Sequence, residues 1–185
     1  MTKSTLKTKR CKKTERGAAL VETAIVLIPL CLIVFGIIEY GFIFKDSLTL
    51  SNATRSGART ASAEPGGPTF YQDTVDAVSR GASGLVMSGG EKLFIYKARP
   101  DGLPESGSDT SCTTNCAEYT WNGGSKRFVL NQNNWPVANH QACFGSADSV
   151  GVILRINHDA LSGFFKDMPL RERTVMRFEP VSSDC

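Results

Sequence analysis

The chain has 185 residues, of which 41% are hydrophobic and 21% are charged, and its formal net charge is +3 at pH 7. The first 17 residues carry seven Lys or Arg and one Glu, a net charge of +6, which leaves 3 − 6 = −3 for the remainder. A basic charge confined to one end excludes a nucleic-acid-binding surface on the rest of the chain, and that rest is long enough for one small domain.

Segment 18–44 is the most apolar part of the chain, and Glu22 and Glu39 are its only charged residues. A helix of about 20 apolar residues crosses the hydrocarbon core of a bilayer, and flanking Lys and Arg stay on the cytoplasmic side. We therefore expect a cytoplasmic basic leader over 1–17 and a transmembrane helix over 18–44. A cleaved secretory signal peptide is the alternative, but its apolar core would be shorter.

The helix is expected to continue over 45–63, because no helix-breaking pair occurs before the Pro-Gly-Gly-Pro run at 65–68. Thr69 and Gln72 then have the spacing of a capping box. Apolar residues recur at helical spacing as far as Leu85, which predicts a second helix over 70–85.

The outer domain is expected over 64–185. After the second helix, its residue pattern predicts mainly strands. An Asn-Gly turn at 122–123 predicts a hairpin, and alternation of apolar and polar residues is clear in the last two segments. We expect an α+β fold with a four- to five-stranded antiparallel sheet and a short helix over 158–166, the strands lying near 92–98, 118–121, 127–130, 150–156 and 174–178.

Two long loops, 99–117 and 131–146, contain three of the six cysteines. Four cysteines in an oxidising compartment predict two disulfides, and the sequence leaves their pairing open. The candidates are Cys112, Cys116, Cys143 and Cys185. A zinc site that combines the first three with His140 is the alternative, but the Cys-x-x-x-Cys pair has no matching second pair. We expect Trp121 and Trp135 to pack in the core or against the loops rather than to bind a ligand.

Catalytic motifs are absent from the sequence. Neither His140 nor His158 lies in a recognised catalytic string, and there is no phosphate loop, nucleophile elbow or zincin helix. We therefore expect a protein that is not an enzyme, with no cofactor, no metal, no nucleic acid and no small-molecule substrate.

The start of the apolar segment resembles a known processing site. The order of residues from Arg16 through Gly17 and Ala18 to Glu22 is similar to the cleavage site of type IV prepilins. Segments 15–24, 35–41 and 50–59, with Pro29 between the first two, look like a TadE-like minor pilin or pseudopilin of the Tad (tight adherence, Flp) pilus system, and 173–180 resembles the closing strand of such proteins. Ala18 and Thr23 depart from the residues usual in other pilins.

This resemblance implies cleavage after Gly17 by a prepilin peptidase, which would make Ala18 the new N-terminus. It further implies that the Glu22 carboxylate pairs with the N-terminal amine of a neighbouring subunit, an attraction that is strong at low dielectric. Pro29 removes one helical hydrogen bond and Glu39 places a charge near the outer interface. These two are the other candidate assembly residues.

The partners implied are the membrane, the prepilin peptidase, other pilins and the Tad platform and secretion machinery. The expected location is the inner membrane of a bacterium, with the N-terminus in the cytoplasm and the outer domain beyond the membrane, or the pilus itself. The alternative function is an uncleaved single-pass protein whose extracytoplasmic domain is a binding module.

Overall fold

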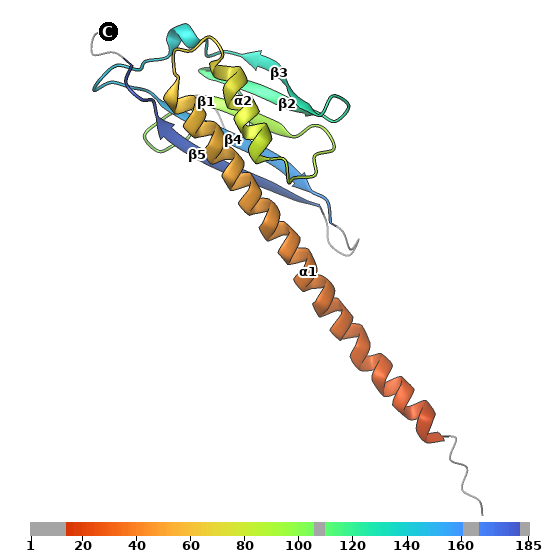
Figure 1. Cartoon of the computed structure of the whole chain (residues 1–185). Coiled ribbons are helices and arrows are strands. Elements are labelled where there is room, and N and C mark those ends of the chain that lie inside the picture. Colours follow the sequence, from red (N-terminus) through yellow and green to blue (C-terminus); the bar gives the residue numbers. More distant parts are fainter. Residues whose placement is uncertain (1–13, 106–109, 161–166, 182–185) are drawn as a thin grey trace, which may run out of the picture. The chain divides into compact units, whose positions relative to one another are not determined.

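The computed structural model describes residues 14–105, 110–160 and 167–181 (Figure 1). The chain divides into two compact units, residues 1–41 and 42–185. Helix α1 (Thr14–Ala63) begins in the first unit and ends in the second. Its stretch Gly17–Ala63 is, within the described ranges, the one helix long and apolar enough to cross a membrane.

In the first unit, α1 keeps its helical conformation through Pro29. The large apolar side chains of this stretch are exposed, from Val34 at 46% to Leu20 at 72%. None of the residues that the structure describes covers them, and a large exposed apolar surface of this kind marks a site of contact with lipid or with other proteins.

The second unit contains a five-stranded sheet in which all neighbouring strands are antiparallel. The spatial order is β3-β2-β1-β4-β5 (Figure 1). The α+β class and the antiparallel sheet predicted from the sequence are confirmed. The strands are β1 (Lys92–Ala98), β2 (Cys116–Asn122), β3 (Arg127–Asn133), β4 (Ser149–His158) and β5 (Met168–Arg177), with one short 3-10 helix, η1 (Val137–Asn139), between β3 and β4.

The inner face of the sheet packs against helix α2 (Phe70–Gly81) and the part of α1 beyond Phe42 (Figure 1). The two helices approach closely because small residues face each other: a Cβ atom added to Gly81 would lie 2.6 Å from Ala53 Cα. Leu50, Val78 and Val152 are fully buried in this core. The small-residue face that the sequence shows on α1 therefore serves packing within the domain.

The outer face carries a smaller apolar cluster that consists of Phe94, Tyr96, Ile153 and the Cys112–Cys116 disulfide. The loop between β1 and β2 covers part of it, since the Tyr96 hydroxyl donates to the Gly102 carbonyl at 2.9 Å. The described part of this loop thus packs over the outer face at Tyr96.

The bounds of two predicted elements differ from the structure, and a third predicted element lies mainly outside the described residues. Helix α2 ends at Gly81 and not at Leu85, and Thr69 precedes it without a side-chain capping bond. Strand β5 begins at Met168, six residues before the predicted start. The short helix expected over 158–166 falls mainly on 161–166, outside the described residues, and His158 is the last residue of β4.

Candidate assembly surface on the N-terminal helix

Gly17 and Ala18 lie on the exposed surface of α1. A Cβ atom added to Gly17 would meet no atom within 4 Å, and the residue lies inside a regular helix. Neither packing within the described residues nor a left-handed backbone conformation therefore requires glycine at this position.

Glu22 is exposed on the same helix, one turn after Ala18. The adjacent Thr23 satisfies its hydroxyl within the helix, by donating to the Ala19 carbonyl at 2.8 Å. Glu22 itself has no ion-pair partner in the part of the chain that the structure describes. A charged carboxylate in an apolar helix is costly unless it is paired, so Glu22 is a candidate for pairing with a group outside the described residues.

The other two predicted assembly residues have different surroundings. Pro29 is one of a run of exposed residues. Glu39 is 3% exposed and engaged in an interaction, although its neighbours Ile38 and Tyr40 are 49% and 71% exposed. The structure therefore does not bring Glu22, Pro29 and Glu39 together into one cluster.

One of the two predicted disulfides joins Cys112 to Cys116, whose Cα atoms lie 5.7 Å apart. Cys143 is also disulfide-bonded, and Cys31 is free and exposed on α1. No group of three or more potential metal ligands occurs within 14–105, 110–160 and 167–181. The zinc alternative would need Cys112 and Cys116 as thiolates, and their disulfide contradicts it.

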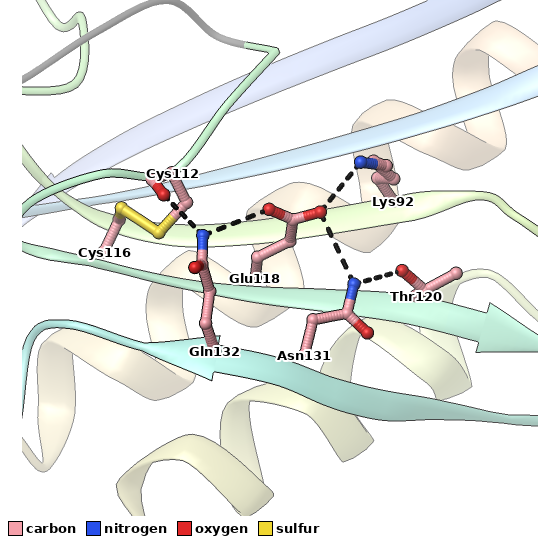
Figure 2. A network of polar contacts seen from close by, with 7 residues as sticks. All are labelled: Lys92, Cys112, Cys116, Glu118, Thr120, Asn131 and Gln132. Carbon is pink, nitrogen blue, oxygen red and sulfur yellow. Dashed lines mark hydrogen bonds and ion pairs between the residues drawn. A yellow bond between two sulfur atoms is a disulfide. The ribbon is translucent and has the colours of Figure 1, made fainter.

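Beside this disulfide lies a polar network that the sequence did not reveal (Figure 2). The buried Glu118 carboxylate accepts a hydrogen bond from Lys92 Nζ at 2.8 Å and weaker ones from Asn131 and Gln132 at 3.4 Å. The Gln132 amide also donates to the Cys112 carbonyl. The network therefore ties the disulfide loop to three strands.

A register shift explains why two consecutive residues of β3 reach the same carboxylate. The pairing of β2 with β3 is irregular between Glu118 and Tyr119, so Gln132 pairs with Glu118 and Leu130 pairs with Tyr119. Side chains alternate between faces in a regular strand, and a bulge allows Asn131 and Gln132 to share the outer face. Only the three-dimensional pairing reveals this site.

An aromatic cluster closes the end of the domain near η1. His140 Nδ1 lies 2.6 Å from the Pro65 carbonyl, and the ring packs on Trp135 with centroids 4.2 Å apart. Burial lowers the pKa of His140 below its usual 6.5, against the opposing effects of hydrogen bonds to backbone carbonyls and of Asp148. Trp135 is fully buried and Trp121 packs against the core, as the sequence predicted.

Burial also raises the pKa of Tyr119 to about 12. This side chain lines a groove of about 500 Å³ between α2 and β3. Tyr71, Val75, Phe128 and Leu130 supply most of its apolar lining. It contains no His or Cys and no pair of interacting carboxylates, so we find no nucleophile with an adjacent base there.

These features define a class of protein: an α+β domain that follows a long, exposed, apolar N-terminal helix, which is a candidate for a single membrane anchor. Residues 17–59 match the family model described as TadE-like protein. The match covers 59 − 17 + 1 = 43 of the 185 residues, so the similarity to that family concerns the N-terminal segment. No curated protein and no solved structure matches the chain.

Proposed function

We propose that the protein is a minor pilin or pseudopilin that takes part in assembly of a Tad-type pilus without catalysing a reaction. The observation that carries the proposal is Glu22, a charged residue exposed on an apolar helix five positions after Gly17. The TadE-like match includes both residues. The enzyme class has no support from the grooves or polar clusters described above.

Cleavage after Gly17 would remove the basic leader and create a free amine on Ala18. Because no described residue packs against Gly17, selection by the pocket of a peptidase would account for a glycine there. The new amine would lie at the start of the apolar helix, one turn before Glu22.

Glu22 would then set the register between neighbouring subunits. The interaction of a carboxylate with an ammonium group about 4 Å away is worth about 4 kcal/mol at an effective dielectric constant near 20. Desolvation offsets part of this gain, but an unpaired carboxylate in the apolar bundle is penalised more. The pair therefore favours one axial position of a helix relative to its neighbour.

In this role the protein would enter the inner membrane with its N-terminus in the cytoplasm and its domain outside. A prepilin peptidase would process it, and other pilins and the Tad platform would contact the exposed face of α1. The alternative, an uncleaved anchor that presents a binding domain, uses the same helix but requires neither cleavage nor the charge on Glu22.

The mature N-terminus separates the two functions. We expect mass spectrometry of the protein from cells that make the pilus to find a chain that starts at Ala18. Gly17→Val should block this cleavage, whereas Gly41→Val, at another helix position with open space around it, should not. A functional protein that retains Met1 would support the uncleaved anchor and exclude the pilin.

Assembly is tested separately from cleavage with Glu22→Ala. We expect normal membrane insertion and normal processing, but loss of the protein from purified pilus or pilin complexes. Thr23→Ala is the matched control, because its hydroxyl bonds only within its own helix. Normal incorporation of the Glu22→Ala chain would remove the register role.

A further inference from the structure

The outer face of the sheet carries three cationic residues in register across neighbouring strands. Lys92 on β1 pairs with Arg155 on β4, and Arg155 pairs with Arg171 on β5. Arg155 projects from the outer face because Leu154 and Ile156 beside it are buried in the inner core. Arg173 adds a fourth cation to the same face of β5. We name these four residues the cationic row.

The cationic row is not explained by the stability of the domain. Neighbouring strands lie about 4.8 Å apart, and like charges directly opposite each other destabilise a sheet. Glu118 is the one acidic strand residue on this face among those described, and it is bonded to Lys92 (Figure 2). Arg155 and Arg173 have no hydrogen bond or ion pair within the described residues. The row therefore retains a net positive charge.

Two hollows lie beside these side chains. Lys92 and Arg155 line one of about 180 Å³. Arg171 and Arg173 line a second, of about 340 Å³. Glu91 also lines the first hollow, where its carboxylate accepts hydrogen bonds from backbone N–H groups, and Glu172 also lines the second, where it accepts one from Ser47. An oxyanion in either hollow has access to two cations, and a guanidinium binds phosphate oxygens in bidentate geometry.

One contact within the outer domain places part of the row beside its own stretch of α1. Glu172, next to Arg171, accepts a hydrogen bond from Ser47 of α1 at 3.5 Å. Ser47 lies five residues after Phe42, roughly 8 Å along a helix. The polar headgroup layer on each side of a bilayer is about 5–8 Å thick. Arg171 therefore lies close enough to this part of α1 to reach headgroups when the hydrocarbon ends near Phe42.

Exposed apolar residues occur at the same end of the domain. Phe42 and Val86 line a hollow of about 390 Å³ together with Lys45 and Asn157, and Asn157 also lines the hollow beside Arg155. Apolar groups beside cations are typical of surfaces that lie at a lipid interface. Asp46 and Asp159 also line this hollow, and Asp46 is paired with Lys45 and His158. Asp159 and Asp167 are exposed acids next to the strand ends.

We propose that the cationic row binds the phosphate groups of anionic phospholipids in the membrane that α1 enters. This contact would hold the outer domain against the membrane surface before assembly. It requires only a membrane anchor, and so it does not depend on cleavage after Gly17 or on pairing of Glu22.

The test uses the full chain in lipid nanodiscs. An environment-sensitive fluorophore is attached at Val86→Cys in a chain that also carries Cys11→Ser and Cys31→Ser. We expect brighter, blue-shifted emission in discs with phosphatidylglycerol than in discs of phosphatidylcholine alone, and reversal by salt. Arg155→Gln with Arg173→Gln should lower the ratio of docked to undocked protein about 30-fold.

The matched control is Arg55→Gln with Arg59→Gln, which removes the same charge from exposed positions on α1. It should leave the response to anionic lipid unchanged. Equal emission in the two kinds of disc would overturn the proposal, as would an unchanged lipid response in the double variant of the row. A change in emission on addition of inorganic phosphate, without any change between the two kinds of disc, would identify a site for free phosphate. That result would also overturn the proposal.

Discussion

Tyr96 lies across Gly151 on the outer face of the sheet, and this contact explains why a glycine occupies the middle of β4. A Cβ atom on residue 151 would overlap the Tyr96 ring, whose hydroxyl holds the covering loop at Gly102. We predict that Gly151→Ala lowers the free energy of unfolding by about 1–3 kcal/mol, as overpacking typically does. Chemical unfolding of the full chain in detergent measures this change.

Gly66→Ala is the control for that measurement, since an added Cβ there meets no atom within 4 Å. It should leave the stability within about 0.5 kcal/mol of the parent chain. Equal stability of the Gly151→Ala chain would show that the Tyr96 ring moves away without cost.

His140 predicts a dependence of stability on pH. Burial lowers its pKa in the folded state, so the unfolded chain binds the additional proton first. Stability is therefore fully present above the unfolded value of about 6.5 and falls as pH decreases through it, by at most about 1.4 kcal/mol per pH unit. Urea unfolding between about pH 7.5 and 5.5 should show this slope.

His140→Gln isolates the effect from other titrating groups, because only the difference between the two chains belongs to this residue. We expect the slope of the variant to be smaller over the same pH range. Parallel stability curves for the two chains would mean that the ring titrates equally in both states.

Residue patterns in the sequence revealed local chemistry and missed chemistry that depends on pairing. Gly17, Ala18 and Glu22 lie close together along the chain, so their spacing can be recognised without a structure. Glu118 and Gln132 are brought together by an irregular strand pairing. No spacing along the chain indicates that contact.

At the scale of elements, the bounds of the central strand β1 could be predicted better than those of the edge strand β5. β1 has the predicted bounds, because its apolar run is buried on both faces. β5 begins earlier than predicted, since its first half presents charged residues such as Arg171 and Arg173 to the outside, as exposed edge strands often do. α2 ends earlier than predicted, at Gly81, a residue of low helix propensity that packs against α1 at Ala53.

The last strand also indicates how the second disulfide is formed. Beyond β5, the Val181 N–H donates to the Ala142 carbonyl at 3.0 Å, beside the disulfide-bonded Cys143. Cys185 is four residues further, and four extended residues span up to about 14 Å. We predict a Cys143–Cys185 disulfide, which peptide mapping without reduction would detect. A peptide that joins Cys143 to another cysteine would contradict it.

Removal of this bond should have a measurable effect on stability. Cys185→Ser should lower the free energy of unfolding by about 2–4 kcal/mol and leave Cys143 reactive to thiol reagents. Cys31→Ser is the control, because Cys31 is already free, and it should change neither quantity.

At the scale of the molecule, the sequence separated the apolar helix from the outer domain because their compositions differ so strongly. It did not reveal the cationic row, since Lys92 and Arg171 are 171 − 92 = 79 residues apart and only the sheet order places β4 between their strands. Composition thus predicts which part enters lipid, whereas strand pairing decides which face of the outer domain carries charge.

The same separation predicts that the outer domain folds without the apolar helix. Its two apolar clusters contain no residue before Leu50, and the structure assigns 42–185 to one compact unit. We expect an oxidised fragment that starts at Phe42 to be soluble and to unfold cooperatively, with a midpoint within about 4 °C of the full chain in detergent, since a shift of that size corresponds to about 1 kcal/mol. Near-ultraviolet circular dichroism, which reports the fixed packing of aromatic residues such as Trp135, measures both midpoints. A fragment with helical far-ultraviolet signal but no near-ultraviolet signal would be a molten globule, and would show that the segment before Phe42 is required for the core to pack.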